Sequence, residues 1–267
     1  MRPPPLSTRQ AAYVVPLVLA SGALVRLMAF WRGIRRARAL SAQGQRFERR
    51  RGARGPAVLI LGDSTGVGIG ARCPEESIAG LLAADFPDAD IVNISASGAR
   101  VCDAVAQARK FDTPERPFDI ALLHVGGNDV VRNTPPQNLA KACEALLAEL
   151  PRLALRTVWL GPPNLGLAPL FPLPFSWLLA ARSRAAAAIF AQSAARHGVA
   201  LVDFSAREHA VRFAHGRRQH FAVDGFHPSS SSYSYGYEAV RRAIGLGLDA
   251  SAATGAPTIE PVPCAGG

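Results

Sequence analysis

One serine and one distant pair of an acid and a histidine are the residues of this chain that could do chemistry together. Ser64 follows the apolar run Ala57–Leu61 and is surrounded by glycines, and Asp224 precedes His227 by three residues. At that spacing the carboxylate can contact one ring nitrogen while the other nitrogen faces a nucleophile. The pattern predicts that Asp224 holds the imidazole tautomer and that His227 takes the Ser64 proton as general base.

Hydrogen-bond donors are also needed, because attack by a serine leaves negative charge on the carbonyl oxygen. Gly98 follows the second short apolar run of the domain, and Asn128 follows the third. In a parallel sheet these positions lie at the same edge as Ser64, where such folds place their ligands. The backbone N–H groups of Ser64 and Gly98 and the side-chain amide of Asn128 are therefore the expected oxyanion donors.

The elements that must position these residues alternate between strands and helices from Ala57 onward. Short apolar runs bounded by Gly, Pro and polar residues predict buried strands, and the longer segments between them predict helices. This alternation predicts an α/β fold in which helices cover both faces of a parallel sheet. Strands are expected at 57–61, 91–94, 118–125, 156–160 and 199–204, and helices at 74–86, 101–110, 137–150, 176–197 and 235–248.

The positive charge of the chain is concentrated in its first 54 residues. The net charge is +10, and residues 1–54 hold twelve arginines against one acid, Glu48. Everything from Gly55 onward therefore sums to about −1. A nucleic-acid-binding face on the folded domain is not implied, and no nucleic-acid partner is expected.

The N-terminal part of the chain predicts association with a membrane. Residues 1–31 are expected to form an anchor or signal-like segment, whose apolar stretch just reaches the roughly 20 residues that cross a bilayer. A single anchor is preferred to a cleaved signal peptide or a helix in the membrane interface. The arginine-rich linker 32–55 then favours a cytoplasmic catalytic domain, 56–249, with an exported domain as the alternative. Residues 250–267 are expected to be a flexible tail.

Four short blocks of the sequence, taken in order, resemble those of the SGNH hydrolases, also called the GDSL esterase and lipase family. The blocks are Gly62-Asp63-Ser64, Gly98, Gly126-Gly127-Asn128-Asp129 and Asp224-Gly225-Phe226-His227. The resemblance covers roughly residues 57–245. It implies a flavodoxin-like three-layer α/β/α sandwich with a five-stranded parallel sheet, and ester hydrolysis without a metal or cofactor. It also implies catalytic roles for Ser64, Gly98, Asn128, Asp224 and His227. One departure is Thr65, where the family often has an aliphatic residue.

The predicted function is therefore hydrolysis of carboxylic esters through an acyl-enzyme intermediate. An acyl or acetyl ester, a lysophospholipid and a thioester are all compatible substrates, so the expected partners are a small-molecule or lipid ester and a membrane surface. A membrane-tethered binding module without turnover is one alternative, and a nucleotide-binding α/β domain is another. The glycine-rich residues 62–70 lack the Gly-Lys-Ser/Thr ending of a phosphate-binding loop.

The apolar, proline-rich residues 161–177 follow the fourth predicted strand at the active edge. They contain Phe171, Phe175 and Trp177. This loop is predicted to line an acyl pocket that faces the membrane. The alternative is a loop packed on the domain surface.

Other polar residues are assigned structural roles. His124 is expected to be a hydrogen-bonded core residue, Asp63 a structural carboxylate, and Asp129 a cap or loop-holding residue. The basic stretch that contains His209, His215 and His220 is expected to be irregular. Cys73, Cys102, Cys143 and Cys264 are expected to be free thiols, since neither cysteines nor histidines show the spacing of a metal site.

Overall fold

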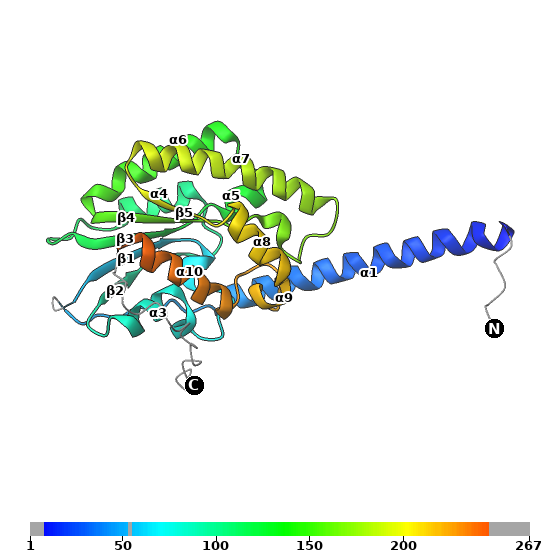
Figure 1. Cartoon of the computed structure of the whole chain (residues 1–267), viewed down its shortest axis with the longest axis horizontal. Coiled ribbons are helices and arrows are strands. Elements are labelled where there is room, and N and C mark those ends of the chain that lie inside the picture. The colour runs from blue at the N-terminus through cyan, green and yellow to red at the C-terminus, as the bar shows by residue number, and fades with distance from the viewer. Residues whose placement is uncertain (1–7, 53–54, 246–267) are drawn as a thin grey trace.

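A five-stranded parallel sheet with the order β2-β1-β3-β4-β5 forms the centre of the molecule (Figure 1). The computed structural model describes residues 8–52 and 55–245, with the backbone alone at 8–20 and 23. This strand order is that of flavodoxin-like folds, so the predicted fold class is confirmed. The strands are β1 (Ala57–Gly62), β2 (Asp90–Asn93), β3 (Phe118–His124), β4 (Ala154–Gly161) and β5 (Ala200–Asp203), each within two residues of its predicted ends.

Helices cover both faces of the sheet (Figure 1). One face carries α4 (Val101–Lys110), α5 (Gly127–Arg132), α6 (Pro136–Glu149) and α7 (Phe175–Arg196). The other face carries α3 (Ile78–Asp85), α8 (Arg207–His215), α9 (Arg217–His220) and α10 (Ser230–Ala243). Within β1, Leu59 and Leu61 belong to the first core, while Val58 and Ile60 belong to the second. The strands read as continuous apolar runs because both of their faces are buried.

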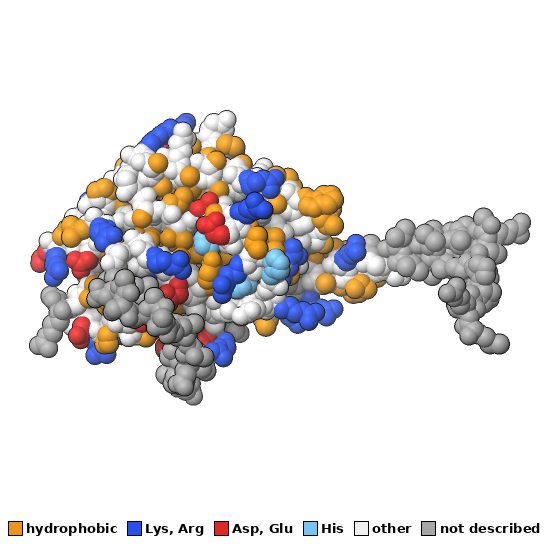
Figure 2. Space-filling model, in the orientation of Figure 1, with side chains coloured by type: hydrophobic (Ala, Val, Ile, Leu, Met, Phe, Trp, Pro, Cys, Tyr) orange, Lys and Arg blue, Asp and Glu red, His pale blue; other side chains and the backbone are white. Residues whose placement is uncertain are grey.

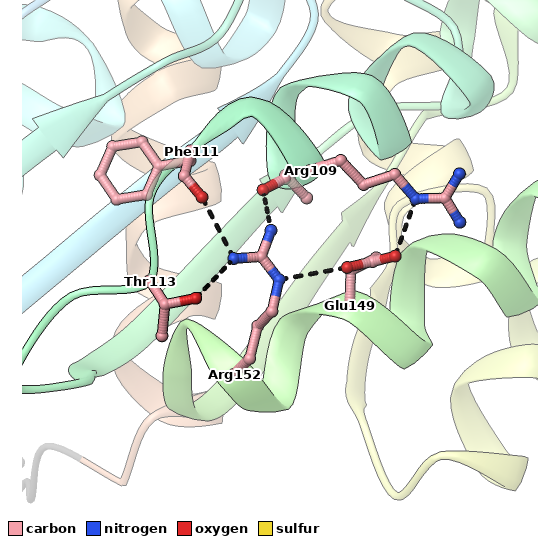
Figure 3. Close-up of polar contacts among 6 residues, drawn as sticks. Arg109, Phe111, Thr113, Glu149 and Arg152 are labelled. Atoms are coloured by element: carbon pink, nitrogen blue, oxygen red, sulfur yellow. Dashed lines mark hydrogen bonds and ion pairs between the residues drawn. The ribbon is translucent and has the colours of Figure 1, made fainter.

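An arginine network holds the end of α4 against α6 (Figure 3). The Arg152 guanidinium donates to the carbonyl oxygens of Ala108 and Phe111 and pairs with Glu149, which also accepts from Arg109. The last carbonyls of a helix have no partner within it, so Arg152 satisfies two of them at the C-terminus of α4.

The N-terminal helix α1 (Thr8–Gln43) projects from the body of the molecule (Figure 1). Within the part of the chain that the structure describes, no helix has an apolar stretch long enough to cross a membrane. The single anchor and the cytoplasmic orientation stay predictions. The arginine-rich stretch differs from the expected linker, because residues 32–43 continue α1. Beyond α1, the Arg49 guanidinium donates to the carbonyls of Ala83 and Phe86, which ties this stretch to α3.

The stretch around His209 to His220 was expected to be irregular, and this prediction is wrong. It forms α8 and α9, and Phe213 is buried in the core beneath α10. Basic residues surround Phe213 in the sequence, so the stretch lacks the apolar periodicity that predicts a helix. The last helix begins at Ser230, earlier than predicted, because the Ser229 side chain caps it by accepting from the N–H of Ser232.

The cysteines also differ in part from the prediction. Cys102 and Cys143 are free thiols as expected, whereas Cys73 is disulfide-bonded. Cys264 lies outside the described residues. The prediction of a free thiol is therefore wrong for Cys73. It failed because the spacing of cysteines along the chain does not show which thiols the fold brings together.

Candidate active site

The backbone at the end of β1 positions Ser64. Gly62 has a φ of 135°, and a Cβ there would lie 2.0 Å from the carbonyl oxygen of His124, so only glycine fits between these paired strands. Asp63 then caps the short helix α2 (Ser64–Val67), because its side chain accepts from the N–H of Thr65 at 2.8 Å. Ser64 is thus the first helical residue after the carboxyl end of a central strand, as the sequence predicts.

The structure brings Ser64, His227 and Asp224 into one hydrogen-bonded chain. The Nε2 atom of His227 lies 3.1 Å from the Ser64 Oγ, and its Nδ1 lies 2.5 Å from Oδ2 of Asp224. All three side chains are more than nine-tenths buried. The distances are those of hydrogen bonds, so a proton can pass from the hydroxyl to the imidazole without a large movement.

Asp224 is held by its own loop. Its Oδ1 accepts from the backbone N–H groups of Phe226 and His227 at 2.9 and 3.0 Å. Burial raises the pKa of Asp224, but the hydrogen bond and the positive charge of His227, together with these two N–H groups, outweigh burial and lower the pKa below its usual value. Asp224 is therefore ionised at neutral pH.

Asn128 lines the same cavity as Ser64. It lies in the first turn of α5, and its amide donates to the carbonyl of Ala99 at 3.0 Å. A side-chain amide carries two N–H donors, so one remains for a ligand. Gly98 precedes this acceptor in the chain and has a φ of 82°. Gly98 therefore lies next to Ala99, whose carbonyl accepts from the Asn128 amide. Gly98 itself is not among the residues that line the cavity.

The other two acids near Ser64 differ in their environments. Asp129 accepts from the N–H of Val101, the first residue of α4, and from the Thr134 hydroxyl, so it holds the loop as predicted. Asp63 is fully buried, and this burial raises its pKa to about 6, although the Thr65 N–H and the charge of His227 act in the opposite direction.

A cavity of about 90 Å³ opens beside Ser64 and His227. Gly161, Pro162 and Leu165, from the start of the 161–177 loop, contribute to its wall. Phe175 and Trp177 do not, because they lie on the surface with 59% and 70% exposure. The beginning of the segment therefore lines a cavity beside Ser64, whereas its aromatic end follows the surface alternative; that the cavity takes an acyl group stays a prediction.

The hydrogen bonding of His124 differs from the prediction. The ring was expected to be hydrogen-bonded, yet neither ring nitrogen has a partner among the described residues. Burial lowers its pKa to about 4, so the ring is neutral at pH 7. The sequence did indicate that His124 lies near the site. It is a histidine at the end of an apolar strand, two residues before the block that begins with Gly126. No three His, Cys, Asp or Glu side chains in the described regions are grouped closely enough to hold a metal ion.

Comparisons with known proteins identify a family for the chain and a shared fold. The model of the GDSL-like Lipase/Acylhydrolase family matches residues 60–235. No curated protein matches the chain. Among solved structures, LAE5, an alpha/beta hydrolase enzyme from the metagenome of Lake Arreo, Spain, is 23% identical with a TM-score of 0.57, covering 72% of this chain and 96% of its own.

Two further structures share the fold. TesA is 22% identical with a TM-score of 0.56, covering 70% of this chain and 97% of its own. A variant of Axe2, an acetyl xylan esterase from Geobacillus stearothermophilus, is 21% identical with a TM-score of 0.54, covering 71% and 94%.

Proposed function

The chain belongs to the GDSL-like lipase/acylhydrolase family, and from this premise we propose that it hydrolyses carboxylic esters with Ser64 as the nucleophile. The observation that carries the proposal is the hydrogen-bonded chain from Asp224 through His227 to Ser64. The proposed catalytic domain, residues 56–249, contains the whole range that the family model matches.

In the first half of the reaction, the Ser64 Oγ attacks the ester carbonyl carbon while Nε2 of His227 takes its proton. The tetrahedral intermediate collapses when the C–O bond to the alcohol breaks, and His227 returns the proton to the leaving oxygen. The acyl group stays on Ser64. Water then attacks the acyl-enzyme with His227 as base, which releases the acid and restores the hydroxyl.

Asp224 and the oxyanion donors stabilise the charges that develop during the reaction. The Nδ1–H group of His227 donates a hydrogen bond to Asp224, so the Nε2 lone pair points toward Ser64. The Asp224 carboxylate also stabilises the imidazolium as it forms. The free N–H of Asn128, with the backbone N–H groups of Ser64 and Gly98, donates to the oxyanion. One such donor is worth about 2.7 to 4 kcal/mol of transition-state stabilisation.

Kinetics on an ester panel test this proposal. The kcat/KM of the full chain is measured on p-nitrophenyl esters for wild type, Ser64→Ala and the control Ser234→Ala. The Ser234 hydroxyl donates to the Ser230 carbonyl in its own helix. We expect a loss of at least about 10⁴-fold in Ser64→Ala and none in the control. Wild type without turnover would instead favour the binding module.

Membrane association is proposed to occur through the surface of α1. Gly33 packs against the body, where a Cβ would meet Leu170. The part of α1 before this contact exposes large apolar side chains, namely Leu24, Val25, Leu27, Met28 and Trp31. Arg32, Arg35 and Arg38 follow along the helix. Hydrophobic and basic side chains gather where α1 leaves the body (Figure 2). This combination fits a helix lying in the interface of an anionic bilayer.

A further inference from the structure

A second concave surface, which we call the α1 groove, lies between α1 and the loop that carries Asp224. Its volume is about 500 Å³, which is within the usual range of small-molecule sites. Residues 169, 170 and 172 and the turn 223–225 form its wall on the side of the body. No described residue lines both this groove and the cavity beside Ser64. The α1 groove is therefore separate from the proposed esterase site.

One face of α1 forms the opposite wall of the groove. Many of the residues that it contributes recur at the three- and four-residue spacing of a single helix face, namely Val25, Met28, Ala29, Arg32, Gly33 and Arg36. Leu24, Leu27 and Trp31 are exposed parts of the proposed membrane surface and do not line the groove. These three side chains are therefore available to a bilayer while the groove holds a different partner.

The groove exposes apolar side chains. Val25, Met28 and Val223 keep 60%, 46% and 72% of their surface exposed. Exposed apolar side chains that border one concave surface mark a binding site for an apolar partner. At Gly33 the two walls are in contact, because a Cβ there would lie 2.4 Å from the Leu170 side chain.

The wall of the groove is also basic. Arg26, Arg32 and Arg36 line it, and α1 contains no acidic residue. The Arg36 guanidinium donates to the Val223 carbonyl at 3.3 Å, whereas Arg26 and Arg32 have no partner among the described residues. The carboxylate of Asp224, the one acid in the described wall, already accepts from His227 and from two backbone N–H groups. The free polar capacity of the wall is thus positive and suits an anionic group.

The size of the groove fits one long acyl chain. A cavity of about 150 Å³ binds benzene, so about 500 Å³ accepts roughly 20 non-hydrogen atoms. A long-chain fatty acid has about this many atoms, with one apolar chain and one carboxylate. A small inorganic anion would leave the apolar wall uncovered, and a phospholipid with two chains exceeds the space.

The body side of the groove includes the backbone that holds Asp224. A Cβ at Gly33 would lie 3.2 Å from the Asp224 carbonyl oxygen. The Leu170 N–H donates to the Gly225 carbonyl at 2.9 Å. A ligand in the groove therefore contacts α1, the Leu170 segment and the Asp224 loop together.

We propose that the α1 groove binds one long-chain fatty acid, with its chain along the apolar wall and its carboxylate paired with Arg26 and Arg32. The bound chain fills the space between α1 and the body, so it stabilises the attachment of α1 beside the Asp224 loop. This site goes beyond the proposed esterase function and does not depend on Ser64.

The test measures binding of cis-parinaric acid, a fluorescent long-chain fatty acid, to the full chain below the micelle concentration of the probe. Wild type is expected to bind about one molecule per chain. Arg26→Gln/Arg32→Gln should weaken binding by about tenfold or more, because it removes both unpaired guanidinium groups from the groove. The control Arg35→Gln/Arg38→Gln makes the same charge change on α1 outside the groove and should bind within about twofold of wild type. Equal weakening of the two double variants, or no change in either, would overturn the site.

A second pair of variants tests the apolar wall. Val223→Ser should weaken binding about fivefold, because an exposed apolar side chain of the groove is lost. The control Val211→Ser, at an exposed valine of α8 outside the groove, should leave binding unchanged. Oleate should displace the probe, and acetate should not. Displacement by acetate as effective as by oleate would indicate an anion site only and overturn the fatty acid. Flotation with anionic vesicles without any binding of the probe would assign the whole of this surface to a bilayer and overturn the groove as a site.

Discussion

Replacing Asp63 with asparagine should make the protein more stable at neutral pH. The carboxyl is fully buried, and burial raises its pKa from 3.8 to about 6. A group whose pKa is higher in the folded state contributes stability below its unfolded pKa and loses that contribution as the pH rises through the folded value. The difference of about two units corresponds to about 3 kcal/mol of unfolding free energy, lost between about pH 4 and pH 7.

Asparagine removes this dependence and keeps the cap. Its side-chain oxygen can still accept from the Thr65 N–H, as Asp63 does, and Asn and Asp are equally good at this position. We expect Asp63→Asn to match wild type near pH 4 and to exceed it by about 3 kcal/mol at pH 7.5. Urea unfolding followed by circular dichroism at pH 4, 6 and 7.5 measures the difference.

Asp88→Asn is the matched control, because Asp88 is exposed and its substitution should leave the difference from wild type nearly constant with pH. Equal stability of Asp63→Asn and wild type across the whole range would refute the reasoning. It would mean that Asp63 is ionised at no cost in its buried position.

Three further predictions concern the site, a helix end and the surface of α1. Asp224→Asn should lower kcat by about 10⁴-fold, because the imidazole then takes the wrong tautomer. Asn128→Ala should lower kcat by about 10²- to 10³-fold, because one oxyanion donor is lost. Steady-state kinetics on a p-nitrophenyl ester check both variants, and a loss below tenfold would contradict the assigned role. Arg152→Ala should lower the unfolding free energy by about 1.5 to 3 kcal/mol, because it removes charged hydrogen bonds at the end of α4; an unchanged urea midpoint would speak against it. Trp31→Ser should reduce flotation of the full chain with anionic vesicles, and equal flotation would contradict the interfacial role of α1.

The frame of the site could be predicted from the sequence because parallel strands have a simple signature. Each strand is buried on both faces and reads as a short apolar run, so the positions of Ser64, Gly98 and Asn128 after successive runs fix them to one edge of the sheet. The pairing of Asp224 with His227 followed from their spacing, since a loop of three residues brings carboxylate and ring together.

The remaining features depend on tertiary packing, which a single sequence does not encode locally. Phe175 and Trp177 are as apolar as any pocket residue, and only the packing of the loop leaves them on the surface. For His124, the strand assignment was right, but the missing hydrogen-bond partners depend on which side chains of α3 and α10 lie opposite. Cys73 is a similar case, because disulfide pairing is decided in three dimensions.

The central claim is that Ser64 is the nucleophile. Reaction of the full chain with a fluorophosphonate probe, followed by mass spectrometry of the intact protein and its peptides, tests it most directly. The account predicts one phosphonate per chain, located on the peptide that contains Ser64 and absent from Ser64→Ala. Labelling at another residue, or a Ser64→Ala variant that still hydrolyses esters at the wild-type rate, would contradict it.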